Sequence, residues 1–129
     1  PALMAPGPSV TPDDVARLPL VQQSTRPEGW RQWFDAQGVA APQARSGPRY
    51  ELFSMLAAAA THGLGVALMP RLLIEDELAR GELIVACPSP LRGERSYFLV
   101  SPAGAAERLA LQRLREWLQA ATAASRSAA

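Results

Sequence analysis

Residues 61–70 read THGLGVALMP, with two glycines one residue apart and a short apolar run that a proline ends. An apolar run of this length between Gly and Pro is typical of a strand that is buried inside a parallel sheet. The preceding residues, LFSMLAAAATHG, have the composition of an apolar helix. We therefore expect this helix to end at Gly63, in the left-handed conformation that glycine adopts easily. We expect Gly65 to let the backbone pass close to a neighbouring segment.

The same two glycines also suggest a dinucleotide-binding loop. That fingerprint requires G-x-G-x-x-G between a strand and a following helix, so that the helix N-terminus faces the pyrophosphate. Here Leu68 stands at the third position, and the order is reversed, because a helix leads into the glycines and a strand leaves them. We therefore reject a nucleotide site and expect no cofactor.

Helices and strands alternate along the chain, judged by the period of their apolar residues. We expect strands at 18–22, 49–52, 65–70, 82–87 and 95–102, and helices at 9–18, 24–38, 52–63, 71–81 and 105–121. This alternation favours an α/β fold with a mainly parallel sheet, flanked by helices and joined by right-handed crossovers.

The first two helices carry capping signals. Thr11 suits the N-cap, Pro12 suits the first helical position, and the two aspartates that follow favour the positive end of the helix dipole. In the second helix, Thr25 and Glu28 have the spacing of a capping box, and Gly38 is expected to end the helix.

Apolar stripes predict which face of each helix is buried. The second helix has one aromatic face, made of Trp30, Trp33 and Phe34. The helix at 52–63 is expected to be largely buried, with a stripe of Leu52, Met55, Leu56, Ala59 and Ala60. The expected buried side of the last helix consists of Ala110, Leu114, Trp117, Leu118 and Ala121.

Length and composition describe one ordinary domain of 129 residues, of which 48% are hydrophobic. The 13 basic residues are all arginine, are scattered and leave a net charge of +1, which argues against nucleic-acid binding by this segment. With Cys87 and His62 as the sole cysteine and histidine, we expect no disulfide, no structural zinc site and a reducing cytoplasm. No signal peptide or membrane span is apparent, and a start at Pro1 suggests processing or a piece of a longer protein.

Hydrolytic chemistry has little support. Ser54 and His62 share one helix, where eight residues at ~1.5 Å rise separate them by roughly 12 Å, outside hydrogen-bonding reach. No G-x-S-x-G elbow is present, and the acidic residues at 13–14 and 75–77 suit a helix N-terminus and a solvated face. We expect no enzyme, and a surface role for His62.

A binding site is more plausible at two loops. Ligands of open α/β sheets sit beyond the carboxyl ends of strands, where loops meet helix N-termini. Residues 23–26, QSTR, end a strand with two hydroxyls, backbone N–H groups and a guanidinium, and residues 49–51, RYE, precede the next helix in the same way. The alternative is that Ser24 and Thr25 only cap a helix.

The ordered series TPDDVARLPLVQQSTRPEGWRQWF, RYELFSMLAAAATHGLGVALMPRLLIEDELARGELI, YFLVSP and LREWL resembles the C-terminal part of LysR-type transcriptional regulators. The likeness is greatest to the branch around the glycine-cleavage activator and covers roughly residues 8 to 120. His62 departs from the family pattern, which usually has a small residue before the Gly-Leu-Gly turn.

The resemblance implies an effector domain of two lobes, like a type 2 periplasmic binding protein, with a small effector between the lobes. Residues 8–95 would form lobe two, 96–121 a returning strand and a C-terminal helix that belong to lobe one, and 122–129 a disordered tail. The helix-turn-helix that binds DNA, the linker helix and most of lobe one would be absent, so DNA binding is expected only through that N-terminal domain.

The resemblance also implies roles for individual residues. The effector-binding residues that the resemblance implies are Ser24, Thr25, Arg49, Tyr50, Glu51 and Tyr97, and Arg26 of the first loop is a candidate from its position beside the two hydroxyl residues. The two arginines, Arg26 and Arg49, favour a small organic anion or an amino acid. Homo-oligomers would pair through the helix that carries the three aromatic residues and through the strand near Arg49. At least two of the aromatics are expected in the core of the subunit, and one facing outward.

Two other functions compete with that of an effector-sensing, oligomerising module in the cytoplasm. The first is a solute-binding protein of the same fold, which would require an export signal on the complete chain. The second is a small hydrolase, which the lack of a paired nucleophile and base disfavours.

Overall fold

The computed structural model describes residues 2–4, 10–92 and 109–127. The chain divides into two compact units, residues 1–92 and 93–129. The strands of the first unit are β1 (Ala2–Met4), β2 (Leu20–Gln23), β3 (Arg49–Tyr50), β4 (Val66–Leu68) and β5 (Ile84–Cys87). Its helices are α1 (Pro12–Val15), α2 (Gly29–Gln37), α3 (Phe53–Thr61), the 3₁₀ helix η1 (Arg71–Leu73) and α4 (Glu75–Ala79).

The strands of the first unit form one sheet in the order β3-β2-β4-β1-β5. β2 runs parallel to both β3 and β4, as the alternation of helices and strands predicts. β1 runs antiparallel to both β4 and β5, so the sheet is mixed. No strand was expected at residues 2–4, and the α/β architecture is otherwise confirmed.

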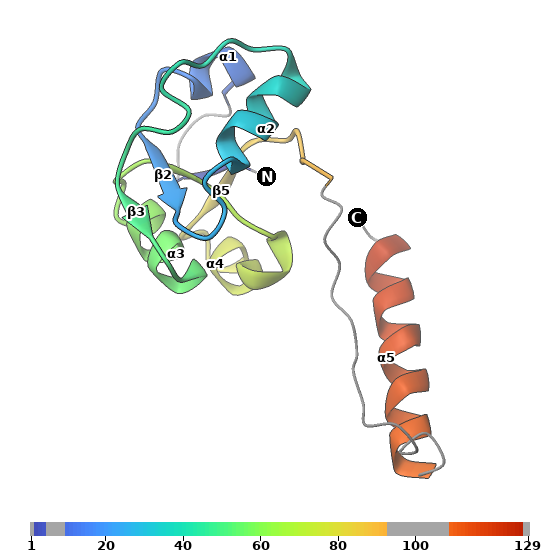
Figure 1. Cartoon of the computed structure of the whole chain (residues 1–129). Coiled ribbons are helices and arrows are strands. Elements are labelled where there is room, and N and C mark those ends of the chain that lie inside the picture. Colours follow the sequence, from blue (N-terminus) through green and yellow to red (C-terminus); the bar gives the residue numbers. More distant parts are fainter. Residues whose placement is uncertain (1, 5–9, 93–108, 128–129) are drawn as a thin grey trace. The chain divides into compact units, whose positions relative to one another are not determined.

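Two layers of helices cover the two faces of the sheet (Figure 1). Side chains alternate between the faces along a strand, so Leu20 packs in the cluster under α1 and α2, while its neighbour Val21 packs in the cluster under α3. Val66 and Ala67 of β4 divide in the same way. This alternation makes a three-layer sandwich with a core on each side of the sheet.

The aromatic face of α2 is confirmed as core. The side chains of Trp30, Trp33 and Phe34 have relative exposures of 2%, 0% and 1%, and their rings lie 5.1–5.7 Å apart between centroids. Both indole N–H groups donate to backbone carbonyls, Trp30 to Val21 at 3.0 Å and Trp33 to Ser89 at 2.7 Å. The expectation that one of the three aromatics faces outward is therefore wrong.

The two glycines of residues 61–70 behave as predicted. Gly63 follows α3 with a φ of 73°, in the left-handed region. Gly65 has a φ of 150°, and a Cβ at this position would lie 2.3 Å from the carbonyl oxygen of Pro19. The next residue, Val66, donates its N–H to that same oxygen at 2.9 Å. Gly65 therefore permits the close approach that joins β4 to the start of β2.

Some expected helix features are wrong. α1 has its capping box at Thr11 and Asp14, but α2 begins only at Gly29, and its N-cap Glu28 makes no capping bond with its side chain. Residues 71–81 form η1 and α4 instead of one helix, because the chain breaks at the buried Ile74. The helix α3 is only half buried, with its buried residues on the sheet side and Leu52 and Met55 exposed beside them.

The second unit contains α5 (Leu109–Ser127), which extends into residues expected to form a disordered tail. The side of α5 that was expected to be buried is mostly exposed, with Leu114 at 47% and Trp117 at 65%. The expected strand at 95–102 lies outside the described residues. None of the helices within the described ranges is long and apolar enough to cross a membrane.

Candidate functional site

The two loops singled out in the sequence meet at one edge of the sheet. β2 and β3 are parallel neighbours, with Gln23 beside Tyr50 in register. The N–H of Ser24 donates to the carbonyl oxygen of Tyr50 at 2.9 Å, which joins the two strands where β2 ends. We call residues 24–28, between β2 and α2, the site loop. Its first residues therefore lie beside residues 50–51, at the carboxyl end of parallel strands, where ligands of open sheets bind.

The side chains at the start of the site loop face solvent. Ser24, Thr25 and Arg26 are exposed, and neither hydroxyl has a hydrogen-bond partner among the residues that the structure describes. Thr25 does not cap α2, which begins four residues later, so the alternative that these hydroxyls serve as helix caps is wrong. The site loop thus presents two hydroxyl groups that are free to bind a ligand.

Arg26 and Phe53 extend this edge toward α3. The guanidinium carbon of Arg26 lies 5.6 Å from the centroid of the Phe53 ring, in a cation–π contact. Phe53 is the first residue of α3 and is half-buried against the core of that face. The contact places the Arg26 guanidinium at the first turn of α3, and a guanidinium together with two hydroxyls in one loop suits a carboxylate.

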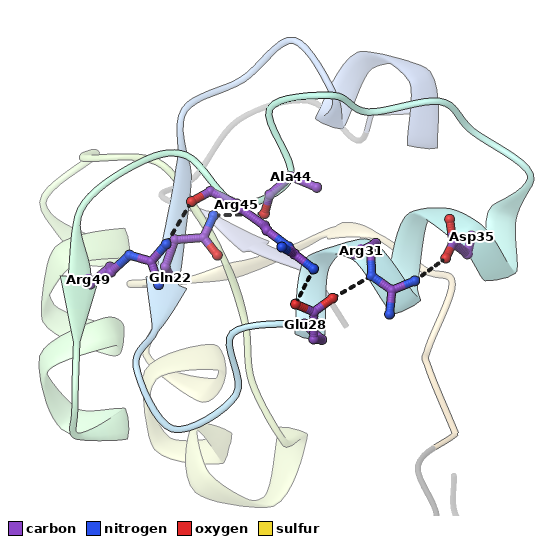
Figure 2. Close-up of polar contacts among 7 residues, drawn as sticks. All are labelled: Gln22, Glu28, Arg31, Asp35, Ala44, Arg45 and Arg49. Atoms are coloured by element: carbon purple, nitrogen blue, oxygen red, sulfur yellow. Dashed lines mark hydrogen bonds and ion pairs between the residues drawn. The ribbon is translucent and has the colours of Figure 1, made fainter.

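The other predicted residues are placed differently. Tyr50 is half-buried against the core beneath α3, so its backbone carbonyl, rather than its ring, reaches the site loop. The Arg49 guanidinium donates to the carbonyl oxygen of Arg45 at 3.0 Å, on the side of loop 41–48 (Figure 2). Glu51 is exposed. Tyr97 lies outside the described residues.

A network of charges surrounds the last residue of the site loop. The Glu28 carboxylate accepts from the Nε of Arg31 and pairs with the guanidinium of Arg45, and Arg31 also reaches Asp35 at 3.0 Å (Figure 2). The hydrogen bond from Arg31, and next that from Arg45, lower the pKa of Glu28 below its ordinary value. Glu28 is therefore ionised at neutral pH, and its negative charge at the start of α2 also suits the helix dipole.

Sequence reasoning missed the residues that hold loop 41–48. Gln22 is buried at 1% exposure, and its Nε2 donates to the carbonyl oxygens of Ala44 at 3.0 Å and Ser46 at 2.7 Å. Gly47 has a φ of 116°, and a Cβ there would lie 2.0 Å from the carbonyl oxygen of Leu20. A glutamine directly after two apolar residues of a predicted strand was the available signal, because a buried amide needs partners.

Ser54 and His62, the two residues considered in the sequence for hydrolytic chemistry, are both exposed at α3. His62 is exposed at the end of α3, and its Nδ1 lies 2.7 Å from the carbonyl oxygen of Ala58. His62 and Ser54 both line an open pocket of about 430 Å³ between α3 and α4, but no nucleophile–base hydrogen bond joins them. Within the described ranges, no group of three or more His, Cys, Asp or Glu side chains is placed to hold a metal ion.

Comparison with known families gives a match over most of the chain. The family model described as "LysR substrate binding domain" matches residues 1–123. The chain is 43% identical over 72 residues to the HTH-type transcriptional regulator TrpI of Pseudomonas aeruginosa, covering 54% of this chain and 24% of that protein. It is 28% identical to the glycine cleavage system transcriptional activator of Escherichia coli, covering 91% of this chain and 38% of that one. The chain thus spans a quarter to two fifths of the length of these relatives.

Solved structures with the same fold are effector domains. The effector domain of the transcriptional regulator AmpR of Pseudomonas aeruginosa superposes with a TM-score of 0.69 at 23% identity, covering 96% of this chain and 60% of that one. The AmpR effector binding domain of Citrobacter freundii gives 0.67 at 20% identity, with coverage of 93% and 61%. At these identities the likeness concerns the fold alone.

Proposed function

Because the chain belongs to the LysR substrate-binding domain family, we propose that it is the effector-sensing and oligomerisation part of a LysR-type transcriptional regulator. It binds a small metabolite, and binding modulates transcription. The observation that carries this proposal is the pairing of Ser24 with Tyr50, because it brings both predicted loops to one edge of the sheet. The matched relatives are named as transcriptional regulators, which favours this function over an enzyme or an exported solute-binding protein.

In this proposal the effector lies between two lobes. Residues 8–95 form lobe two, while the returning strand and the helix at 96–121 belong to lobe one. The exposed apolar side of α5 supports this division, because an amphipathic helix is stable only when its apolar stripe is covered. The rest of lobe one is thus the surface that we expect to cover Leu114 and Trp117.

The effector is a small organic anion or an amino acid. The hydroxyls of Ser24 and Thr25 donate hydrogen bonds, and the Arg26 guanidinium supplies a positive charge that its contact with Phe53 holds in place. A carboxylate uses both kinds of donor, and charge-assisted hydrogen bonds of this type are the stronger ones. Arg49, Tyr50, Glu51 and Tyr97 remain proposed contacts of the same site.

The complete protein works as a homo-oligomer in the cytoplasm and binds DNA through a separate N-terminal domain. The subunits pair through α2 and the strand near Arg49. Since the aromatic residues of α2 are buried in the core, the exposed face that carries Gln32 and Ala36 makes this contact. The proposed interface is therefore not the aromatic contact expected from the sequence.

The test is a thermal-shift assay of the complete protein with a fixed panel: the twenty protein amino acids, acetate, succinate and citrate. At about 100 times its Kd, a ligand stabilises the folded state by about 2.7 kcal/mol, which gives a measurable shift of Tm. We expect at least one compound to raise Tm, and Ser24→Ala and Arg26→Ala each to reduce that shift. Arg17→Ala, at an exposed position that precedes the opposite end of β2, is the matched control.

Two outcomes contradict the proposal. If no panel compound raises Tm, the effector is not an amino acid or one of these carboxylates. If a shift survives both Ser24→Ala and Arg26→Ala, the ligand binds somewhere other than the site loop.

A further inference from the structure

We propose that Arg45 is a positioning residue that holds the site loop in place for the effector; this inference rests on the function proposed above. Arg45 belongs to loop 41–48, and its guanidinium pairs with Glu28, the last residue of the site loop (Figure 2). The pair joins two segments that are separated along the chain by the whole of α2. It is thus a long-range contact from a neighbouring loop, made directly to the site loop.

The backbone on both sides of Arg45 is fixed from the core. The Nε2 of the buried Gln22 donates to the carbonyl oxygens of Ala44 and Ser46, the two residues that flank Arg45 (Figure 2). Gly47 brings the same loop into close contact with the backbone of Leu20 in β2. Arg45 therefore extends from a fixed backbone, and its pair with Glu28 ties the site loop to the core of the sheet.

The contacts around Arg45 close a ring. The carbonyl oxygen of Arg45 accepts from Arg49 at 3.0 Å, and Arg49 precedes Tyr50 in β3. Tyr50 in turn accepts from the N–H of Ser24 at 2.9 Å, at the first residue of the site loop. The site loop is thus held at its first residue by β3 and at its last residue by Arg45.

Arg31 provides a comparison within the same network. It also binds Glu28, but it lies three residues further along α2, so its bond stays within the first turn of that helix. Without the Arg31 side chain, the site loop keeps its ion pair with loop 41–48, whereas removal of the Arg45 side chain breaks that ion pair. In both variants Glu28 keeps one arginine partner. A difference between the variants therefore reports the contact between the two loops and not the loss of every partner of Glu28.

The experiment is hydrogen exchange, followed by mass spectrometry, on the complete protein and its Arg45→Ala and Arg31→Ala variants without added ligand. Three amides in and next to the site loop donate hydrogen bonds in the structure and can report its opening: Ser24 to Tyr50, Arg26 to Gln23 and Gly29 to Arg26. Loss of an exposed ion pair increases the population of the locally opened loop only by a small factor. We therefore expect peptides that cover residues 23–29 to exchange about two- to fivefold faster in Arg45→Ala than in the wild type. Exchange in α3 serves as the internal control and stays unchanged, as does loop exchange in Arg31→Ala.

The second readout is binding of the compound that gives the largest Tm shift in the panel. We expect its affinity to fall several-fold in Arg45→Ala and to stay at the wild-type value in Arg31→Ala. Unchanged loop exchange in Arg45→Ala, or equal acceleration in both variants, overturns the inference whatever the ligand does. Faster exchange with unchanged affinity also overturns it. In that case Arg26→Ala separates the positioning role of Arg45 from the proposed function. If Arg26→Ala abolishes binding, the site loop still binds the effector and only the role of Arg45 is wrong. If Arg26→Ala retains binding, the effector does not bind at the site loop and both proposals are wrong.

Discussion

Gly65 lies where β4 approaches the start of β2 so closely that no side chain fits at this position. Its φ of 150° is one that L-residues rarely adopt, and a Cβ would lie 2.3 Å from a backbone oxygen. Gly63, two residues earlier, has a φ of 73°, but a Cβ there meets nothing within 4 Å. The two positions therefore favour glycine for different reasons. Position 63 requires only a left-handed backbone, whereas position 65 requires a positive φ and also the absence of a Cβ.

This difference predicts unequal costs for the two alanine substitutions. Gly63→Ala should lower the free energy of unfolding by about 1–2 kcal/mol, the cost of a left-handed alanine. Gly65→Ala should cost more than this, because β4 must also move away from Pro19. Urea unfolding of both variants measures the comparison, and an equal or smaller loss in Gly65→Ala contradicts the close approach.

Glu28 makes a pH-dependent contribution to stability. Its arginine partners lower its pKa in the folded state, so the folded protein binds the proton of this group less readily than the unfolded chain does. The stabilisation is complete above the ordinary pKa of glutamate, about 4.3. It is lost as the pH falls through the lowered folded-state pKa.

The expected result concerns the difference in urea midpoint between the wild type and Glu28→Gln. That difference should be present at pH 7 and should shrink as the pH falls below the ordinary glutamate range. The matched control is Glu75→Gln, on an exposed side chain of α4. A difference that stays constant down to pH 3, or one that grows, argues against an ionised Glu28 held by its arginines.

At the scale of elements, α2 and α5 carry similar apolar stripes with opposite outcomes. In α2 the spacing i, i+3, i+4 predicted one aromatic face, and all three rings are buried against the sheet. In α5 the stripe was equally clear, but Leu114 and Trp117 are exposed. A periodic pattern shows which face of a helix needs a partner, whereas the partner itself is a property of the rest of the protein.

We expect two tryptophan substitutions in this chain to separate these cases. Trp33→Ala removes a fully buried ring and its bond to Ser89, which should lower the free energy of unfolding by about 3–5 kcal/mol. Trp117→Ala removes an exposed ring, which should change it by less than about 0.5 kcal/mol. Chemical denaturation measures both, and a large loss in Trp117→Ala contradicts the exposed face of α5.

Helix boundaries were harder to predict than helix faces. The Thr25–Glu28 spacing indicated a capping box, but Glu28 instead binds two arginines, one of them from a distant loop. Between η1 and α4, Ile74 is fully buried and has a non-helical φ of −138°, so the predicted continuous helix is interrupted there. Both errors arise where tertiary contacts decide a local structure.

At the scale of the whole molecule, the α/β architecture followed from the alternation of helices and strands, and so did the edge where the site loop lies. The antiparallel strand β1 could not be predicted in this way. A strand of three residues has no usable period, and β1 is defined by its pairing with β4 and β5. The partners of Gln22 and Arg45 could not be predicted either. Each of these contacts joins residues far apart in the sequence, and although a glutamine in a buried strand signals a need for partners, no local pattern identifies them.

We propose that the site loop senses an effector and that the bound effector modulates transcription. The most direct test measures transcription from a promoter that the complete protein controls, with the panel compound of largest Tm shift, in the wild type and in Arg26→Ala. We predict that the compound changes transcription in the wild type and not in Arg26→Ala, while both proteins bind the promoter DNA equally in a mobility-shift assay. An unchanged response in Arg26→Ala, or a response lost together with DNA binding, would contradict the claim.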